Sequence, residues 1–400
     1  MYKRQGVDGT NGDSFFASVE FTETELILTL KDGTVLNVPL STNATGIPSD
    51  TQAEKNPEID QANTSIPNFI TEIEEGSDNK VMRMSLTGIK TPDNDWMKLY
   101  GTGDARQNIW IEIDGKPKGF TVINSEEVAS RASVVSKAKA DVVFLVDNSG
   151  SMGEEANAIA RDIIEWSGKL SQTMDVRFGC VGIDHRYVNG ALNITTVDKL
   201  HEYLNRSTGI SRTQGFGGPD AATLDQKADD FNTAGGECGG IMLHFADQSF
   251  DFREGANRIY VHFTDEPNQP NYNGKWSVES VNPNSEYYIW GTDKGTIHTI
   301  FSDLGRYPED WSGWTPLYKE KPWLLSDYTG GTKIIDAPSN FEGVSLDSLP
   351  VTGAILNSYI LRINVTPDLL TGTHTVKITI LSEDGSVKAE KVFENVTFNI

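Results

Sequence analysis

The sequence predicts an α/β protein with a doubly wound, mainly parallel sheet, inserted in or flanked by an antiparallel β-sandwich. From Ala140 to about Ser358, apolar strand patterns alternate with amphipathic helix patterns, an order typical of parallel sheets covered by helices. The stretches before and after it hold only short strand patterns separated by turns. Neither stretch has enough strands to enclose a core alone, so we expect the two to form one sandwich.

The 400 residues divide into six expected segments. Residues 1–14 have two parts. Met1–Gln5 resembles a translated sequencing adapter, and the residues after it form three Gly-x-y triplets with the collagen period. Residues 15–42 form a β-hairpin module with a turn at Asp32-Gly33. The other segments are a linker at 43–67, the first half of the β-sandwich at 68–133, the α/β domain at 134–358 and the second half of the β-sandwich at 359–400.

Hydrophobic periodicity predicts the individual elements. In the α/β domain we expect strands at Asp141–Val146, Val176–Ile183, Asn257–Thr264, Gly295–Phe301 and Thr332–Asp336, and helices at Glu154–Leu170, Thr196–Asn205, Pro219–Phe231, Cys238–Asp247, Glu320–Thr329 and Leu346–Asn357. In the sandwich we expect strands at Asn68–Glu75, Lys80–Ile89, Trp96–Gly101, Asn108–Asp114, Gly119–Asn124, Tyr359–Thr366, Thr373–Ser382 and Ser386–Ile400.

The composition narrows the classes of partner. The formal net charge is −23, with 57 acidic against 34 basic side chains, which disfavours nucleic acid or an anionic membrane as a partner. The same charge suits an extracellular protein that binds divalent cations. No apolar run reaches membrane-spanning length. With only Cys180 and Cys238, a disulfide framework or zinc cluster is excluded, and two unpaired thiols are favoured over a bridge.

A candidate cation site follows the first strand of the α/β domain. The apolar run Val142–Val146 ends in Asp147, Ser149 and Ser151, and an amphipathic helix pattern comes next. This places one carboxylate and two hydroxyls at the carboxyl end of a strand, where open α/β sheets bind ligands. These hard oxygen donors suit Mg²⁺, Ca²⁺ or Mn²⁺ and not zinc or copper. The alternative is a Ser/Gly-rich turn that caps the helix.

The Asp-x-Ser-x-Ser pattern resembles the metal-ion-dependent adhesion site (MIDAS) of von Willebrand factor type A (VWA) domains. The strand Asn257–Phe263 followed by Thr264-Asp265-Glu266-Pro267 is similar to the family's fourth strand, and the resemblance implies that Asp265 completes the site. The loop Arg212–Ala221 looks like the family's middle loop, which implies Thr213 as the remaining ligand. Gly217 and Asp220 depart from the family pattern there.

Three acidic residues are candidates for additional metal binding. Asp220 competes with Thr213 as a ligand, and Glu154 and Glu155 stand where some integrin-type relatives hold a second ion. For all three we favour the alternative of helix first-turn acids, which the helix dipole stabilises.

Aromatic residues follow two strands at the metal-bearing end of the sheet. We expect them to form a rim that selects the partner, because large aromatics are common binding anchors. The alternative is that the rings pack on one another to hold a long loop. The rim candidates are Tyr272, Trp276, Tyr307, Trp311, Trp314 and Tyr318.

The resemblance implies a non-enzymatic, divalent-cation-dependent adhesion or ligand-binding protein. A bound cation, most simply Mg²⁺, with Ca²⁺ or Mn²⁺ as alternatives, would capture a carboxylate presented by a protein or glycan. The Gly-x-y triplets and hairpin resemble surface lipoproteins of Bacteroidetes-type bacteria, which implies an extracellular or cell-surface location and a lipid anchor in a missing N-terminus. The alternatives are a metal-assisted hydrolase or enzyme accessory, and a structural module of a surface or phage-like fibre. Against the hydrolase, no histidine or glutamate base can be placed beside the motif from the sequence.

Overall fold

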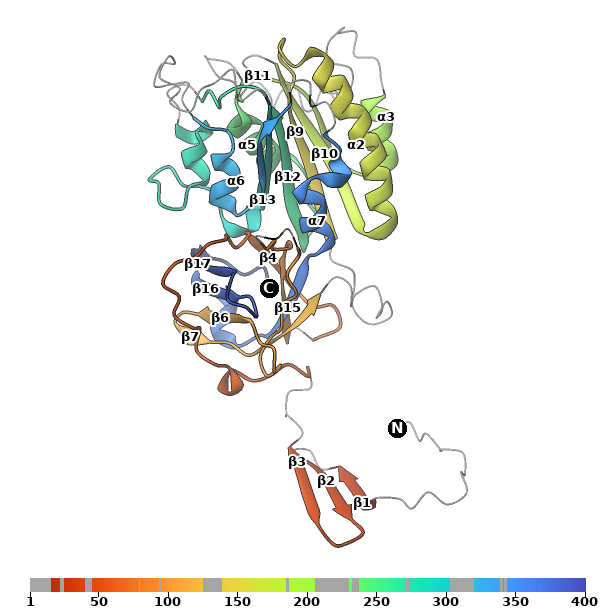
Figure 1. The fold of residues 1–400 in the computed structure, drawn as a ribbon, viewed down its shortest axis with the longest axis vertical. Coiled ribbons are helices and arrows are strands. Elements are labelled where there is room, and N and C mark those ends of the chain that lie inside the picture. Colours follow the sequence, from red (N-terminus) through yellow and green to blue (C-terminus); the bar gives the residue numbers. More distant parts are fainter. Residues whose placement is uncertain are drawn as a thin grey trace.

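The computed structural model places three sheet-containing parts in space (Figure 1). A large sheet covered by helices lies at one end of the molecule, two smaller sheets lie next to it, and a three-stranded sheet of the N-terminal region stands apart. The residues that the structure describes are 16–21, 25–39, 45–78, 80–91, 93, 95–124, 139–184, 187–205, 230–231, 237–270, 274–302, 320–338, 341 and 344–400.

The large sheet has six strands in the order β11-β10-β9-β12-β13-β14. The strands are β9 (Lys139–Asp147), β10 (Asp175–Asp184), β11 (Tyr187–Thr195), β12 (Ala256–Thr264), β13 (Thr296–Ser302) and β14 (Lys333–Ala337). All neighbours pair in parallel except β10 and β11, so the expected mainly parallel sheet is confirmed. β10 and β11 lie on one side of β9 and the later strands β12 to β14 lie on the other, so the junction of β9 with β12 is the switch point where such sheets bind ligands.

Helices cover both faces of this sheet (Figure 1). They are α2 (Gly153–Thr173), α3 (Val197–Leu204), α5 (Gly239–Ser249), α6 (Leu324–Thr329) and α7 (Pro350–Leu356). On β9, Val142, Phe144 and Val146 belong to a core cluster with α2, whereas Val143 and Leu145 belong to a second cluster with α5. Burial on both faces is the reason that this strand is apolar at every position from Val142 to Val146.

Two four-stranded sheets combine segments from before and after the α/β domain. Their orders are β4-β5-β15-β8 and β17-β16-β6-β7. The strands are β4 (Phe69–Ile73), β5 (Val81–Leu86), β6 (Ile109–Ile113), β7 (Lys116–Pro117), β8 (Phe120–Asn124), β15 (Tyr359–Asn364), β16 (His374–Leu381) and β17 (Lys388–Val396). Apolar side chains of both sheets belong to one core cluster, so neither chain segment encloses that core without the other.

The two-sheet unit contacts the α/β domain at the amino ends of the parallel strands. The Asn68 side chain donates a hydrogen bond of 3.0 Å to the carbonyl of Gly295, which precedes β13. The Asn68 amide donates to the Thr329 carbonyl at 3.1 Å. Lys139, at the start of β9, forms an ion pair with Glu72 of β4 at 3.2 Å. The carboxyl ends of β9 and β12 therefore lie at the far end of the sheet from this unit.

One strand was not predicted, and one predicted strand does not form. Tyr187–Thr195 forms β11, an antiparallel edge strand whose Asn and Gly residues interrupt the apolar pattern of a buried parallel strand. Trp96–Gly101 is not a strand beyond one bridge from Trp96 to Lys90. There the Asn124 side chain bonds both the N–H and the carbonyl of Leu99, which satisfies the backbone without a ladder.

Helix boundaries also differ in the second half. α6 begins at Leu324 and not at Glu320. The expected helix Leu346–Asn357 is split at Leu349 and Pro350 into a short 3₁₀ turn and α7, with the proline in the first helical turn, where its missing N–H costs nothing. The expected helix Pro219–Phe231 lies outside the described residues, except for Asp230 and Phe231.

The remaining elements are short. The N-terminal sheet contains β1 (Phe16–Phe21), β2 (Glu25–Leu30) and β3 (Val35–Pro39), with Gly33 in the left-handed region at the predicted turn. The 3₁₀ turns are η1 (Asp50–Gln52), η2 (Gly274–Trp276), η3 (Val278–Val281), η4 (Thr292–Lys294), η8 (Leu346–Ser348) and η9 (Pro367–Leu370). Within the described residues, no helix is long and apolar enough to cross a membrane.

Candidate metal centre

Asp147 is the last residue of β9 and is fully buried. Its Oδ1 accepts a hydrogen bond of 2.9 Å from the amide of Ser149, an Asx-type turn that bends the chain out of the strand. Its Oδ2 accepts one of 3.0 Å from the hydroxyl of Thr264 at the end of β12. The carboxylate is thus held between the ends of two adjacent parallel strands.

Ser149, Ser151 and Asp265 lie beside the Asp147 carboxylate. The hydroxyl oxygens of Ser149 and Ser151 lie 3.1 Å apart, and the Ser151 hydroxyl donates to Oδ1 of Asp265 at 3.1 Å. The structure therefore brings together Asp147, Ser149, Ser151 and Asp265, as the sequence predicted. Thr213 lies outside the described residues.

The oxygen spacing fits a hard cation. Neighbouring ligands of an octahedral Mg²⁺ at about 2.0–2.1 Å from the ion stand about 3 Å apart, close to the 3.1 Å separations among Ser149, Ser151 and Asp265. Within the described residues, no group of three His, Cys, Asp or Glu side chains meets as a ligand set. A cation held here would consequently take its ligands from hydroxyls as much as from carboxylates.

Negative charge accumulates at this edge of the sheet. Burial raises the pKa of Asp147 well above its ordinary value, and the charges of Glu237 and Asp265 raise it further. Among the described residues, no Lys or Arg forms an ion pair with Asp147. Because a divalent cation stabilises the charged form of carboxylates around it, these groups suit a cation site.

Glu237 is a member of this group that the sequence reasoning missed. Burial raises its pKa to about 7, and the charges of Glu266 and Asp265 add to the effect. Its carbonyl accepts from the Gln269 amide at 2.9 Å, and the Gln269 side chain bridges Glu237 at 3.3 Å and Glu266 at 2.9 Å. The structure therefore places near the motif a glutamate that could not be placed from the sequence. An acid directly before Cys238-Gly239-Gly240, at the start of α5, was the available signal.

Hydrogen bonds of the Asn268 side chain hold the loop that carries Asp265 in place. The Oδ1 of Asn268 accepts from the amide of Gly240 at 3.1 Å, and its Nδ2 donates to Glu320 at 2.6 Å. Glu320 also accepts from the Val278 amide at 3.0 Å and from the Ser277 hydroxyl. Burial raises the pKa of Glu320. The position of Asp265 is thus tied to the start of α5 and to the η2–η3 segment.

The other predicted site residues have different positions. Glu154 and Glu155 fall in the first turn of α2, and Glu155 is buried. Trp276 is only 4% exposed and packs with Phe231 and His244 at ring-centroid distances of 5.0 and 5.6 Å. It is a core residue, so the rim prediction is wrong for Trp276 and the packing alternative applies. The candidates outside the described residues are Asp220, Tyr272, Tyr307, Trp311, Trp314 and Tyr318.

The buried histidines and cysteines do not add ligands to this site. Burial lowers the pKa of His262 and of His298 to about 3, so both rings are neutral at pH 7, and both are buried in strands. Cys180 and Cys238 are both buried and free, which agrees with the preference for unpaired thiols.

Comparison with known proteins adds little to the fold. No protein-family model matches the chain, and no curated protein matches it. Among solved structures, the crystal structure of the ArnB paralog VWA2 from Sulfolobus acidocaldarius is similar over 85% of this chain and 75% of that chain, with 12% sequence identity and a TM-score of 0.28. A TM-score this low carries no argument about fold or function.

Proposed function

We propose that the chain is a VWA-type protein that binds a divalent cation at a MIDAS-like site and uses it to capture a carboxylate of a protein or glycan partner. Asp147, Ser149, Ser151 and Asp265 would hold the ion, with Thr213 as a further ligand. Mg²⁺ is the favoured ion, with Ca²⁺ and Mn²⁺ as alternatives. The function is adhesion or ligand binding at a bacterial cell surface, without turnover.

One observation supports this proposal above the others. The side-chain oxygens of Ser149, Ser151 and Asp265 follow one another at distances of 3.1 Å. They lie beside Asp147, which is buried and whose pKa is raised by burial and by neighbouring negative charges. Two neutral hydroxyls would contact the ion directly, while Asp147 and Asp265 would hold it mostly through water, so a bound cation would keep uncancelled positive charge and an open position. That residual charge favours an anionic ligand from outside the chain.

A cation titration and a binding assay test the two halves of the proposal separately. Calorimetry with Mg²⁺, Mn²⁺ and Ca²⁺ measures cation binding directly, and Ser151→Ala is expected to weaken it because one ligand oxygen is lost. Pull-down of surface proteins and glycans with Mg²⁺ and with EDTA then measures capture. Cation binding without EDTA-sensitive capture would leave a metal site but remove the adhesion function.

A metal-assisted hydrolase is the second candidate, and Glu237 favours it. A glutamate with a pKa of about 7 beside a cation site is a suitable general base. A bound cation would lower that pKa, which works against the role and keeps adhesion as the first proposal. The discriminating experiment is a screen of ester, phosphoester and peptide substrates with Mg²⁺. Turnover that disappears in Glu237→Gln would make the protein an enzyme.

The proposal also covers the architecture and the location. We infer that the two four-stranded sheets form the β-sandwich into which the α/β domain is inserted, because side chains of both sheets share one core cluster. An extracellular location is supported by the net charge of −23. Tyr307, Trp311, Trp314 and Tyr318 would form the partner-selecting rim.

A further inference from the structure

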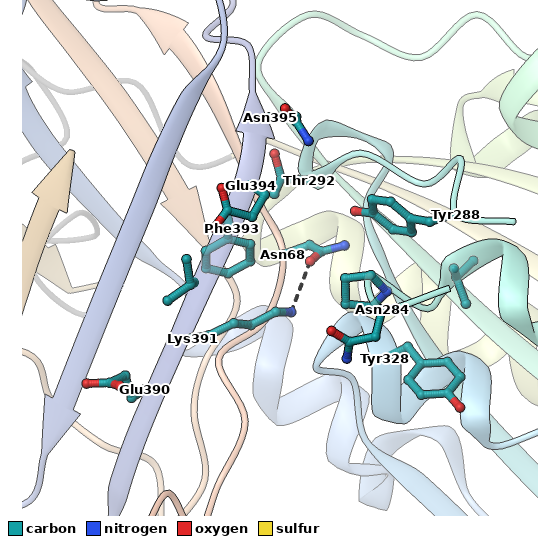
Figure 2. A pocket seen from close by; sticks show the side chains of 13 residues that line it. Asn68, Asn284, Tyr288, Thr292, Tyr328, Glu390, Lys391, Phe393, Glu394 and Asn395 are labelled. Atoms are coloured by element: carbon teal, nitrogen blue, oxygen red, sulfur yellow. Dashed lines mark hydrogen bonds between the residues drawn. The ribbon is translucent and has the colours of Figure 1, made fainter. Parts of the chain in front are cut away.

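A cavity of about 430 Å³ lies between β17 and the loops at the amino-end side of the large sheet. Its walls come from both halves of the junction: Asn68, Lys391 and Asn395 from the two-sheet unit, and Asn284, Tyr288 and Tyr328 from the α/β domain (Figure 2). Because Asn68 bonds Gly295 just before β13, this cavity is at the opposite end of the parallel strands from Asp147 and Asp265. Its volume is in the range of small-molecule sites.

Lys391 is the one cation among the cavity-lining residues. Its ammonium donates to the Ile66 carbonyl at 3.2 Å and to Asn68 Oδ1 at 3.3 Å, and it lies 4.6 Å from the centre of the Phe393 ring. In the described portion of the chain, no carboxylate is within ion-pair distance of it. Burial lowers its pKa to about 8. An ammonium has three donors, and these contacts leave one of them for a ligand.

The two acidic residues of the same wall are occupied elsewhere. Glu390 forms an ion pair with Lys377 at 3.0 Å and accepts from the Thr379 hydroxyl. Glu394 accepts from the Thr375 hydroxyl at 2.7 Å. Among the described residues, neither carboxylate forms an ion pair with Lys391, so the ammonium of Lys391 can pair with an incoming anion.

The facing wall supplies flat aromatic surface and amide groups. Figure 2 shows Tyr288 and Tyr328 across the cavity from Lys391, with Asn284 between them and Asn395 toward the end of β17. Aromatic rings pack against the apolar face of a ring-shaped ligand. Asparagine side chains both donate to and accept from hydroxyl groups. A cation, two aromatic rings and several amides together define a specific chemistry.

We propose that this cavity binds a hydroxylated-ring ligand with one carboxylate, the chemistry of a uronic acid. The carboxylate accepts from Lys391, the sugar ring packs on Tyr288 and Tyr328, and the hydroxyls bond Asn284 and Asn395. The ligand contacts the two-sheet unit and the α/β domain at once, so its binding also stabilises the junction between them. This site acts without the cation, at the other end of the sheet.

Calorimetric titration of the full chain in EDTA tests the proposal, with three probes. D-glucuronate should bind in the millimolar range, whereas D-glucose, which lacks the carboxylate, and acetate, which lacks the ring, should each bind at least tenfold more weakly. Methyl β-D-glucuronide identifies the source of the ligand. Binding equal to that of glucuronate indicates a glycan chain end, and its loss indicates a free sugar acid, and both results support the site.

Lys391→Met keeps the aliphatic stem and removes the charge, so it should weaken glucuronate binding about tenfold or more. Lys388→Met is the matched control, because Lys388 lies on the same strand but does not line the cavity. Absence of glucuronate binding by the unsubstituted chain overturns the proposal whatever the variants do. Equal binding of acetate and glucuronate overturns it too, since it shows a simple anion contact. Binding of an acidic peptide in place of all sugars would make β17 a peptide-binding edge and also overturn it.

Discussion

The hydroxyl of Ser151 donates a 3.1 Å hydrogen bond to Oδ1 of Asp265, although 114 positions separate the two residues. The contact exists because β9 and β12 are parallel neighbours whose register places Val146 opposite Phe263. Asp147 and Thr264 then fall side by side, and the residues that follow each strand meet at one edge. The predictions on the metal centre depend on this junction.

Mg²⁺ is expected to stabilise the protein. At a hundredfold excess over its dissociation constant, a ligand of the folded state raises the free energy of unfolding by about 2.7 kcal/mol. Asp147→Ala and the isosteric Asp147→Asn should abolish that increment, whereas Asp198→Ala, at an exposed site in the first turn of α3, should keep it. The measurement is urea denaturation with and without the ion. Unchanged stability with Mg²⁺, Mn²⁺ and Ca²⁺ alike would contradict the metal assignment.

Stability without metal should fall as pH rises from about 4.5 to about 7. The pKa of Glu237 is about 7 in the folded state and ordinary, about 4.3, when unfolded. The folded state therefore holds more protons in this window, and the stability present below the unfolded pKa is lost as pH passes the folded one. Asp147, whose pKa is also raised, acts in the same direction.

Denaturation in EDTA at a series of pH values measures this slope. Glu237→Gln removes one of the titrating groups and should flatten the profile. The difference in slope between the unsubstituted protein and Glu237→Gln therefore measures the contribution of Glu237 to the pH dependence of stability. With saturating Mg²⁺ the added stability should instead grow with pH, because protons compete with the cation for the carboxylates. A profile that Glu237→Gln leaves unchanged would be inconsistent with a buried, proton-binding Glu237.

Gly240→Ala is expected to destabilise the start of α5. A Cβ at Gly240 would stand 2.0 Å from the Trp276 carbonyl oxygen, a backbone atom that cannot move freely. Overpacking of this kind costs about 1–3 kcal/mol, and cation affinity should also fall because the Gly240 amide bonds Asn268. Gly168→Ala in α2 is the control, since its Cβ would meet nothing closer than 3.6 Å. It should be neutral or stabilising by about 1 kcal/mol.

Removal of residues 359–400 should unfold the strands between 69 and 124. β15 is hydrogen-bonded between β5 and β8, and β16 pairs with β6, so the deletion takes a central strand from one sheet and a pairing partner from the other. Hydrogen exchange or limited proteolysis of β4–β8 measures the effect. Protection of these strands in the truncated protein would rule out a shared core.

A single substitution gives a graded version of that test. Leu361→Ala, at a fully buried position in β15, should cost about 2–5 kcal/mol. Leu356→Ala, 41% exposed at the end of α7, should cost far less.

Substitution of Trp276, Trp311 and Trp314 distinguishes a tryptophan buried in the core from tryptophans that contact a partner. Trp276→Ala should destabilise the protein by about 3–5 kcal/mol, because that ring is buried against Phe231 and His244. The double variant Trp311→Ala/Trp314→Ala should instead reduce partner capture while the melting temperature and cation affinity stay unchanged. A loss of stability comparable to that of Trp276→Ala would show that these two rings are also packed inside.

Local patterns were sufficient for several residues of the site. Asp147, Ser149 and Ser151 follow one apolar strand within five positions, and Asp265 follows another, so the rule that parallel strand ends share one edge brings them together. For Glu237 the only signal is its place directly before the start of α5, which does not predict the site, because Glu237 approaches it through tertiary contacts with Gln269 and Glu266. The Trp276 ring could not be placed from its sequence neighbours, because burial depends on Phe231 and His244 on other segments.

The fold shows the same division. Buried parallel strands such as β9 and β12 are apolar throughout and were predicted within a few residues. β11 carries polar residues and pairs only with β10, so no strand periodicity identified it. Trp96–Gly101 has strand-like residues, but the Asn124 side chain takes its backbone bonds at Leu99, a contact that no local pattern encodes.

The place of β15 between β5 and β8 has a consequence for synthesis of the chain. The strands between 69 and 124 are made well before β15 and β16, and their sheets stay incomplete until those later strands have been made. At about 5–20 residues per second, the α/β domain can assemble during translation while the edges of β5 and β8 remain unpaired. Those edges expose unpaired backbone groups during that interval, so the nascent protein is most vulnerable to aggregation before β15 has been made.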